Sequence, residues 1–247
     1  MPPDLEQRAF AVVIPVYNHE GRVREVASAA AGLGMPVIVV DDGSTDGSYE
    51  AVRDLPGIEI LRHPKNQGKG AALLTGFARA AGFARWAVTL DADGQHDPAE
   101  IPGMIQTLGP GERAIVVGAR EGMDGVHVPW TSRFGRKFSN FWVWIAGGPR
   151  MADSQSGFRV YPLPETLHLD VAARRFQYEV EVLVKARWKG IRVREVPVTV
   201  SYHPGMPRIS HFRPFIDFMR NSRTFSRLIL RRIFVPKTIR GKRPPTP

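Results

Sequence analysis

The stretch RWAVTLDADGQH, residues 85–96, runs from a short apolar segment directly into acidic and amide side chains. A short, strongly apolar run of this kind is typical of a strand that is buried on both faces of a parallel sheet. The chain then delivers Asp91, Asp93 and Gln95 in quick succession. Because ligands of open α/β sheets bind beyond the carboxyl ends of the strands, the stretch predicts both a fold class and the place of a site.

Three further apolar runs accompany this one, and helix-length segments separate them. The runs are AVVIPV (11–16), PVIVV (36–40) and AIVVGA (114–119), and the expected helices are 20–33, 46–54, 68–82 and 98–108. Strands that alternate with helices predict a doubly wound α/β domain over roughly residues 8–120. Residues 121–165 look less regular and hold an aromatic cluster, whereas 176–190 predict a helix and 191–202 a strand.

The side chains of Asp91, Asp93 and Gln95 offer hard oxygen ligands. Such ligands suit Mg²⁺ or Mn²⁺, the expected cofactor. A divalent ion at this position would bridge a diphosphate and stabilise it as a leaving group. A solvated turn explains an isolated Asp-x-Asp equally well, so the metal hypothesis depends on what the neighbouring strand ends contribute.

Acidic residues also follow the second predicted strand, in VVDDGSTDGS (39–48), next to the loop that closes VVIPVYN (12–18). Asp41 and Asp42 are therefore expected at the same sheet edge as Asp91. An acid at such a position accepts hydrogen bonds from a nucleotide base or from ribose hydroxyls. The alternative is a polar turn in which Asp46 caps the following helix.

A third segment, HPKNQGKGAALLTGF (63–77), places glycines at the start of a predicted helix. Gly68 and Gly70 permit tight backbone turns, and Lys69 is a candidate to offset phosphate charge. Neither phosphate-binding pattern, G-x-x-x-x-G-K-[ST] or G-x-G-x-x-G, is present. A helix start with permissive glycines is the alternative interpretation.

The motifs VIPVYN, VVDDGSTDGS, NQGKGAAL and DADGQH occur in this order and spacing, and in this the chain resembles inverting family 2 glycosyltransferases. DSQSGFRVYP (153–162) and EVPVTVSYHPG (195–205) narrow the resemblance to dolichyl- or polyprenyl-phosphate sugar synthases. It covers about residues 9–212. It implies the A-type fold, which is a Rossmann-like, mostly parallel sheet with helices on both faces. It also implies transfer of a sugar from a UDP- or GDP-linked donor to a lipid-linked phosphate.

The resemblance assigns roles to the residues at the strand ends. The expected donor-binding residues are Pro15, Tyr17, Glu20, Asp41, Asp42, Lys69, Asp91, Ala92, Arg120 and His203. Asp93 and Gln95, with Asp91, are the expected metal ligands. The chain departs from the family pattern at three positions. His19 stands where a glutamate is common, and His203 and His211 stand nearest the usual basic residues before the domain ends.

The acceptor side is expected in TSRFGRKFSN (131–140), where Arg133 and Arg136 would bind the acceptor phosphate. A polyprenyl phosphate is already ionised at neutral pH, so it needs positioning and charge screening but no general base. If the acceptor is instead a hydroxyl of a glycolipid or cell-envelope molecule, a base must remove its proton. Asp153 is then the candidate, with a loop cap as its alternative role. The predicted catalytic set is Asp91, Asp93 and Asp153.

The net charge of +10 is confined to the end of the chain. Residues 1–205 hold 23 Lys and Arg against 23 Asp and Glu, whereas residues 206–247 hold 11 against a single acid, Asp217. This asymmetry points to an anionic surface as a partner. We therefore expect a catalytic domain at 1–212 and a basic amphipathic helix with a disordered tail at 213–247. The helix would lie on a membrane, or its apolar side would pack on the protein core.

The bulk properties restrict the remaining possibilities. Cysteine is absent and no apolar run reaches bilayer-spanning length, which favours a cytoplasmic protein that is peripheral on the cytoplasmic face of a membrane, alone or with a membrane protein partner. The alternative outside enzymes is a basic nucleic-acid-binding protein, suggested by a pI of about 10.4. No RNA- or DNA-binding motif is visible, so no nucleic-acid partner is expected.

Overall fold

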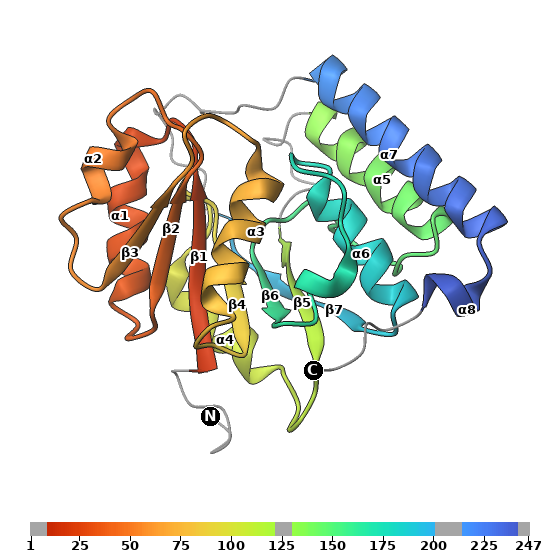
Figure 1. Cartoon of the computed structure of the whole chain (residues 1–247), viewed down its shortest axis with the longest axis horizontal. Helices are drawn as coiled ribbons and strands as arrows, with labels where there is room; N and C mark the ends of the chain where they lie inside the picture. Colours follow the sequence, from red (N-terminus) through yellow and green to blue (C-terminus); the bar gives the residue numbers. More distant parts are fainter. Residues whose placement is uncertain (1–8, 122–129, 201–213, 242–247) are drawn as a thin grey trace.

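The computed structural model describes residues 9–121, 130–200 and 214–241 of the 247-residue chain. Its centre is a seven-stranded sheet in the order β3-β2-β1-β4-β6-β5-β7 (Figure 1). The strands are β1 (Phe10–Val16), β2 (Val37–Asp41), β3 (Ile58–Arg62), β4 (Trp86–Thr89), β5 (Ala114–Arg120), β6 (Arg159–Pro162) and β7 (Arg192–Val198). Only β6 runs antiparallel to its neighbours, β4 and β5. The predicted α/β class with a mostly parallel sheet is confirmed.

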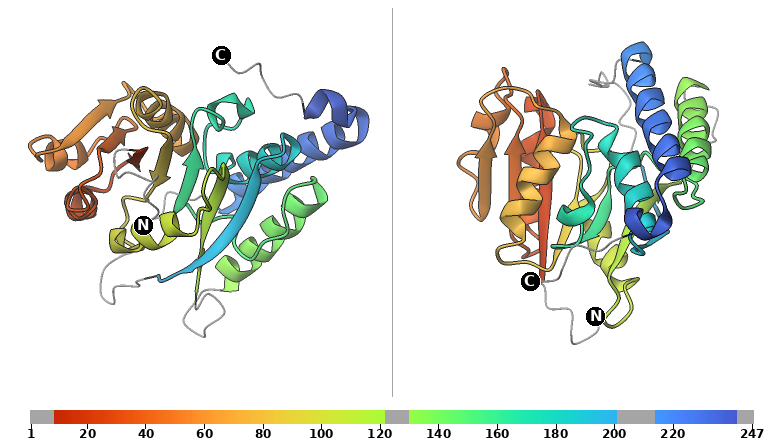
Figure 2. Two further views of the ribbon diagram at one scale, coloured as in Figure 1. Left: turned by 90° about the horizontal axis from the view of Figure 1, so that it is seen from below. Right: turned by 45° about the vertical axis from the view of Figure 1, so that its right-hand side comes forward.

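Helices cover both faces of the sheet (Figures 1 and 2). They are α1 (Glu20–Ala31), α2 (Ser48–Val52), α3 (Lys69–Ala80), α4 (Ile101–Gln106), α5 (Trp130–Ile145), α6 (Tyr178–Trp188), α7 (Pro214–Phe234) and α8 (Lys237–Arg240), with short 3₁₀ turns η2 (Pro98–Glu100) and η3 (Leu167–Leu169). The helices predicted from sequence are confirmed within a few residues of their ends. The exposed helices α5 and α7 lie side by side beyond α6.

Strand β1 separates two hydrophobic cores, because successive side chains of a strand point to opposite faces. Its even-numbered residues, from Phe10 to Val16, pack with α1, α2 and α4. Ala11 and Val13 pack on the other face with α3 and α6. All seven residues of β1 are buried, which explains why its sequence is continuously apolar.

Helix α3 approaches β1 closely at Gly76. A Cβ added at Gly76 would lie 2.4 Å from Val13 Cγ1 and 3.3 Å from Val40 Cγ2. We therefore expect Gly76→Ala to lower the free energy of unfolding by about 1–3 kcal/mol, although alanine favours helix. Gly103→Ala in α4 is the matched control, because nothing lies within 4 Å of the added atom. It should stabilise by about 0.5–1 kcal/mol. Equal urea unfolding curves for the two variants would contradict the close packing of α3.

Residues 121–165 were expected to be less regular than the rest, but Trp130–Ile145 form the helix α5. Val143 on one side of this helix is buried in a cluster with residues of α6 and α7. Ala146, the residue that follows the helix, is buried in the same cluster. Another side leaves Phe134 and Phe141 exposed. The sequence of α5 nevertheless carries a clear helical period of apolar residues, which a search for short apolar runs overlooked.

Two strands were also missed, each for a different reason. Strand β3 is an edge strand with the sequence IEILR, which is only partly buried and so lacks a continuous apolar run. Strand β6 is short and begins with Arg159, a fully buried arginine. Neither pattern meets the apolar-run criterion that identifies β1, β2, β4 and β5.

The tail helix α7 packs on the protein core over part of its length, while its role at a membrane stays a prediction. Phe225 and Leu228 are buried in a small core with α5 and α6. Towards the end of the helix, Ile233 and Phe234 are 67% and 75% exposed. Among the helices that the structure describes, none combines the length and the apolar character that a membrane span requires.

Candidate active site

The predicted acidic residues gather at the carboxyl edge of the sheet. Strand β4 ends at Thr89 and leads into Asp91 and Asp93, while Asp41 ends β2 and pairs in register with Val16 of β1. Strand β5 ends nearby at Arg120. These motifs therefore lie at one edge of the sheet, as expected from their positions at the carboxyl ends of strands.

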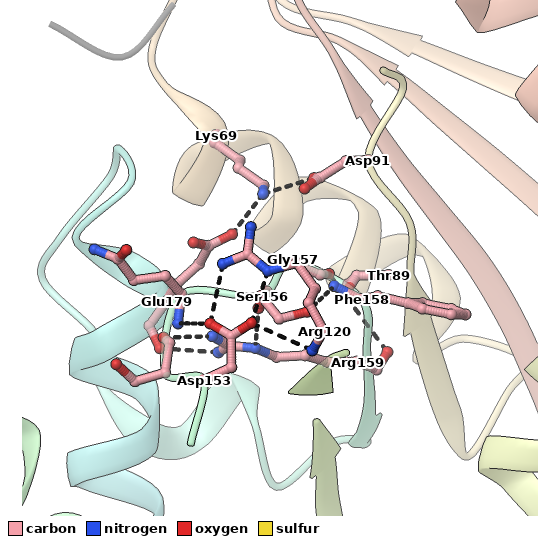
Figure 3. Close-up of polar contacts among 12 residues, drawn as sticks. Lys69, Thr89, Asp91, Arg120, Asp153, Ser156, Gly157, Phe158, Arg159 and Glu179 are labelled. Carbon is pink, nitrogen blue, oxygen red and sulfur yellow. Dashed lines mark hydrogen bonds and ion pairs between the residues drawn. The ribbon is translucent and has the colours of Figure 1, made fainter. Parts of the chain in front are cut away.

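Lys69 lies between two carboxylates rather than free in solvent (Figure 3). Its Nζ is 2.6 Å from Asp91 Oδ1 and 2.5 Å from Glu179 Oε1 on α6. Burial by itself would lower the pKa of Lys69, but the two carboxylates outweigh it and raise that pKa. The ammonium of Lys69, the first residue of α3, therefore stays charged and offsets the negative charge of Asp91.

The two acids of the DADGQH segment differ in their electrostatics. Burial would raise the pKa of Asp91, but the Lys69 ammonium outweighs this effect and holds it below its ordinary value. Burial, and then the negative charge of Asp91, raise the pKa of Asp93. Asp93 Oδ1 accepts the N–H of Gln95 at 3.0 Å. Asp93 is therefore a partly buried carboxyl for which additional positive charge would be favourable.

This arrangement fits a divalent cation. The donor set consists of hard oxygens, and the charge of Asp93 lacks the compensation that Lys69 gives to Asp91. Among the residues that the structure describes, no group of three His, Asp or Glu side chains is placed to enclose a metal. A Mg²⁺ or Mn²⁺ ion held by Asp93, Gln95 and Asp91 would thus complete its shell with water and substrate phosphate, as Mg²⁺ commonly does.

The loop before β6 lies directly beneath the pair of Lys69 and Asp91. A Cβ added at Gly157 would lie 2.5 Å from both Lys69 Nζ and Asp91 Oδ2, so a larger residue there would displace the ends of these two side chains. Thr89 Oγ1 donates to the Gly157 carbonyl at 2.6 Å. The DSQSGFR segment therefore forms the floor of the site, close to the strand end that carries the acids.

Two arginines hold this loop (Figure 3). Arg120 binds Asp153 in a two-pronged ion pair, with Nε to Oδ2 at 2.6 Å and Nη2 to Oδ1 at 3.0 Å. The Arg159 guanidinium donates to the carbonyl oxygens of Ser154, Ser156 and Glu179. Burial would raise the pKa of Asp153, but its hydrogen bonds with Arg120 lower it overall.

Asp41 and Asp42 have distinct surroundings. Asp41 Oδ1 accepts the N–H of Ser44 at 2.8 Å, and Oδ2 lies 3.0 Å from Arg62 Nε. Asp42 holds the glycine segment before α3: it accepts the N–H of Gln67 at 2.9 Å and that of Gly68 at 2.7 Å.

A buried chain of polar contacts supports Asp42. His63 Nδ1 lies 2.7 Å from Asp42 Oδ1, and His63 Nε2 lies 2.9 Å from Thr75 Oγ1 on α3. Asp42 thus positions the segment that carries Lys69. A direct contact of either Asp41 or Asp42 with a nucleotide stays a prediction.

The other predicted donor residues lie around the same loops. Pro15 is buried in β1 and Tyr17 is half-buried directly after it, while Ala92 is buried between the two acids. Glu20 is exposed and connects α1 to the loop before α2, because its Oε2 accepts the N–H of Gly47 at 3.3 Å. His203 lies outside the described residues, as does His211.

The predicted acceptor residues lie on α5. Arg133 is half-buried and Arg136 is buried. The same helix is attached to the Asp153 loop, because Ser139 Oγ lies 2.9 Å from Ser154 Oγ and Asn140 Oδ1 accepts the Ser154 N–H at 2.9 Å. Two consecutive residues thus attach α5, the helix that carries Arg133 and Arg136, to the floor of the site.

Sequence inspection missed Glu179, Arg159 and His63 as parts of the site. One signal was available for Glu179: the α6 sequence YEVEVLVKARW is apolar on all sides except for a few charges, and its residues from Tyr178 to Ala186 are buried. Buried charges need partners, so acids in such a helix indicate ion pairs. No sequence signal identifies the cation that pairs with each acid.

A solved structure identifies the class of this fold. Mannosyl-3-phosphoglycerate synthase from Rubrobacter xylanophilus superimposes with a TM-score of 0.60 at 16% identity, over 94% of this chain and 79% of that chain. The fold is that of the A-type glycosyltransferases. Residues 11–163 match the family described as glycosyl transferase family 2, and the chain belongs to that family. It is therefore a glycosyltransferase.

Two curated relatives are similar over most of the chain. One is the UDP-N-acetylglucosamine–dolichyl-phosphate N-acetylglucosaminyltransferase of Methanococcus voltae, at 30% identity over 80% of this chain and 88% of the relative. The other is the dolichol-phosphate mannosyltransferase of Pyrococcus furiosus, at 30% identity over 76% of this chain and 55% of the relative.

Proposed function

We propose that this glycosyltransferase moves a sugar from a UDP- or GDP-linked donor to a polyprenyl or dolichyl phosphate at a membrane surface, with inversion at the sugar carbon. The names of both curated relatives include a dolichyl- or dolichol-phosphate acceptor. The alternative is transfer to a hydroxyl of a glycolipid or cell-envelope acceptor.

The surroundings of Asp153 favour one of these two acceptors over the other. Both of its oxygens are bound by Arg120, it is fully buried, and its pKa is below the ordinary value. Such a carboxylate is a poor general base, because a base needs a pKa near the working pH and reach to the proton that it removes. A phosphate acceptor is already ionised and needs no base, so the arrangement favours it over a hydroxyl.

The proposed reaction forms one bond and breaks one. An oxygen of the acceptor phosphate attacks the anomeric carbon of the sugar, and the bond from that carbon to the nucleoside diphosphate breaks. The diphosphate leaves with the bonding electrons, and no proton has to move. A divalent ion, when bound, supplies charge that stabilises the leaving diphosphate.

We assign the residues of the chain to three tasks in this reaction. Asp91, Asp93 and Gln95 hold the metal. Arg133 and Arg136 orient the acceptor phosphate. The remaining donor-side residues bind the nucleotide-sugar and are Pro15, Tyr17, Glu20, Asp41, Asp42, Lys69, Ala92, Arg120 and His203.

A substrate screen tests the proposal. Purified protein with Mn²⁺ is incubated with UDP- and GDP-linked sugars, with and without a polyprenyl phosphate, and the lipid fraction is assayed for sugar. We expect a product linked through phosphate, which mild acid releases. Sugar transfer to a glycolipid hydroxyl, with none to the lipid phosphate, would favour the alternative acceptor.

We also propose that the chain binds the cytoplasmic face of an anionic membrane through α7 and α5. Exposed aromatic residues occur on both helices, among them Trp144 at 42% and Phe234 at 75%. Exposed arginines such as Arg223 and Arg231 add positive charge on α7. Each basic residue near such a surface contributes about 1 kcal/mol, which favours a peripheral helix. A membrane protein partner would strengthen the same attachment.

We expect the protein to float with anionic vesicles but not with neutral ones, and added salt to weaken the binding. The double variant Ile233→Ser and Phe234→Ser should lose most of it, because both side chains are exposed in the structure. Truncation within α7 is a poorer test, since it would remove the buried Phe225. Phe83→Ser, at an exposed phenylalanine after α3, is the control. Equal flotation of all three proteins would exclude the tail from membrane binding.

A further inference from the structure

Glu181, in the first turn of α6, is a buried carboxylate with four donors around it. Its side chain is only 1% exposed. Its Oε1 lies 3.1 Å from Lys185 Nζ and accepts the N–H of Ala172 at 3.2 Å. Its Oε2 accepts the N–H of Ala173 at 3.0 Å and a hydrogen bond from Arg227 Nη2 at 2.6 Å. Glu181 thus joins the segment before α6 to the tail helix α7.

Glu181 holds the segment of residues 172–175 through Ala172 and Ala173. This segment packs against the start of α3 and the glycine before it. The Arg174 carbonyl accepts the N–H of Ala71 in α3 at 2.9 Å. A Cβ added at Gly68 would lie 2.6 Å from that same carbonyl oxygen, so the two segments are in close contact. Any shift of residues 172–175 would therefore displace the start of α3, where Lys69 begins the helix.

Two acids in the first turn of α6 have different partners, one at the site and one on the tail helix. Glu179 binds Lys69 at 2.5 Å, and Glu181 binds Arg227 at 2.6 Å. Figure 1 shows α6 between α3 and the pair of α5 and α7. A buried charge needs its partners, and loss of Arg227 would leave Lys185 as the remaining cation of the two ion pairs that Glu181 forms. The Arg227 guanidinium is therefore an electrostatic support for the donor side of the site.

We propose that Arg227 is a positioning residue for donor binding, which it supports through Glu181 and residues 172–175. The tail helix α7 then supports donor binding in addition to its proposed contact with a membrane. This inference rests on the proposed function, in that the site takes a nucleoside diphosphate-sugar. Arg227 is suited to this role because its side chain is 50% exposed, so its polar contact matters more than its packing.

The experiment compares Arg227→Gln with Arg223→Gln, a change at another exposed arginine of the same helix, and with Arg227→Lys, which keeps the charge. All measurements use the full chain without membranes. Hydrogen exchange reports on the amides of residues 66–73. Calorimetry with Mn²⁺ reports the binding of UDP and of GDP, and thermal unfolding checks that each variant is folded.

We expect Arg227→Gln to speed exchange at Ala71 and to weaken nucleotide binding, each by about tenfold, because a hydrogen bond to a buried charge is lost. Arg223→Gln should match the wild type, and Arg227→Lys should recover part of the binding. If Arg227→Gln and Arg223→Gln agree in both exchange and binding, the inference is wrong. If the wild type binds neither UDP nor GDP, the proposed donor class is wrong, and the role of Arg227 in donor binding falls with it.

Discussion

Replacement of Asp93 by alanine should leave a folded protein whose sugar transfer is at least about a thousandfold slower. The pKa of Asp93 is raised in spite of the nearby Lys69, whereas Asp91 forms an ion pair with Lys69 at 2.6 Å and has a lowered pKa. Charge stabilisation of a leaving diphosphate by a metal ion amounts to several kcal/mol, and each 1.4 kcal/mol or so changes a rate tenfold.

The fold should tolerate this change. Burial, and then Asp91, raise the pKa of Asp93 in the folded protein. A carboxyl with a raised pKa opposes folding at neutral pH, where it has to be ionised. Loss of the side chain should therefore leave the free energy of unfolding unchanged or higher, which separates the effect on catalysis from an effect on folding.

Three measurements check this prediction: transfer of radiolabelled sugar, Mn²⁺ binding by calorimetry in the presence of nucleotide, and thermal unfolding. Asp97→Ala is the control, because Asp97 is four residues away and caps the turn η2, where its Oδ1 accepts the Ala99 N–H at 2.9 Å. It should cost about 1 kcal/mol of stability and keep activity. A folded Asp93→Ala protein that transfers sugar at the wild-type rate in chelator would disprove the metal assignment.

A second large effect is expected at Asp153, where alanine should lower the free energy of unfolding by about 3–5 kcal/mol. The carboxylate is fully buried and binds Arg120 through both oxygens. Its removal leaves the Arg120 guanidinium, whose side chain is 14% exposed, without this charge partner. Asp54→Ala is the comparison, because the ion pair of Asp54 with Arg24 is on the surface and should contribute nothing measurable.

The same ion pair predicts a dependence of stability on pH. The pKa of Asp153 is lower in the folded protein than its ordinary value of 3.8. The ionised carboxyl therefore stabilises the fold fully above about pH 5, and this contribution is lost as the pH falls towards about 3 and below. Urea unfolding of wild type and Asp153→Asn at several pH values tests this. If the two proteins lose stability in parallel over that range, the Arg120 pair does not contribute as the structure implies.

The sequence predicts the parts of the fold that are uniformly apolar and the parts that follow strand ends. Strands β1, β2 and β4 are entirely buried, so their continuous apolar runs identify them. Asp41 ends β2, and the loop that carries Asp91 follows β4 directly. Strand β3 was missed because it is only partly buried and so has no unbroken apolar run. Helix α5 was missed although its apolar residues do follow a helical period.

The ion pairs of the site are harder to predict than its location. Glu179 lies 110 residues after Lys69 in the chain, and Asp153 lies 33 residues after Arg120. Nothing local in a sequence determines such pairings, because they depend on how β6 and α6 return to the sheet. Sequence inspection could therefore offer Lys69 as a cation on the donor side, but it could not show that Asp91 and Glu179 hold this side chain. A contact of Lys69 with a donor phosphate stays a prediction.

The antiparallel direction of β6 has a consequence for how this chain can diversify. Strand β5 leaves the sheet at the edge that carries the site, and because β6 runs the opposite way, the chain re-enters at that same edge. The end of β5, the start of β6 and the attachment of α5 to the Asp153 loop therefore all lie at the edge of the sheet that carries the site (Figure 1). Helix α5 can change in length or chemistry while β1, β2 and β4 keep their places. On the proposed assignment of Arg133 and Arg136, a change in α5 would therefore alter acceptor binding while the strand ends that carry Asp41 and Asp91 stay in place.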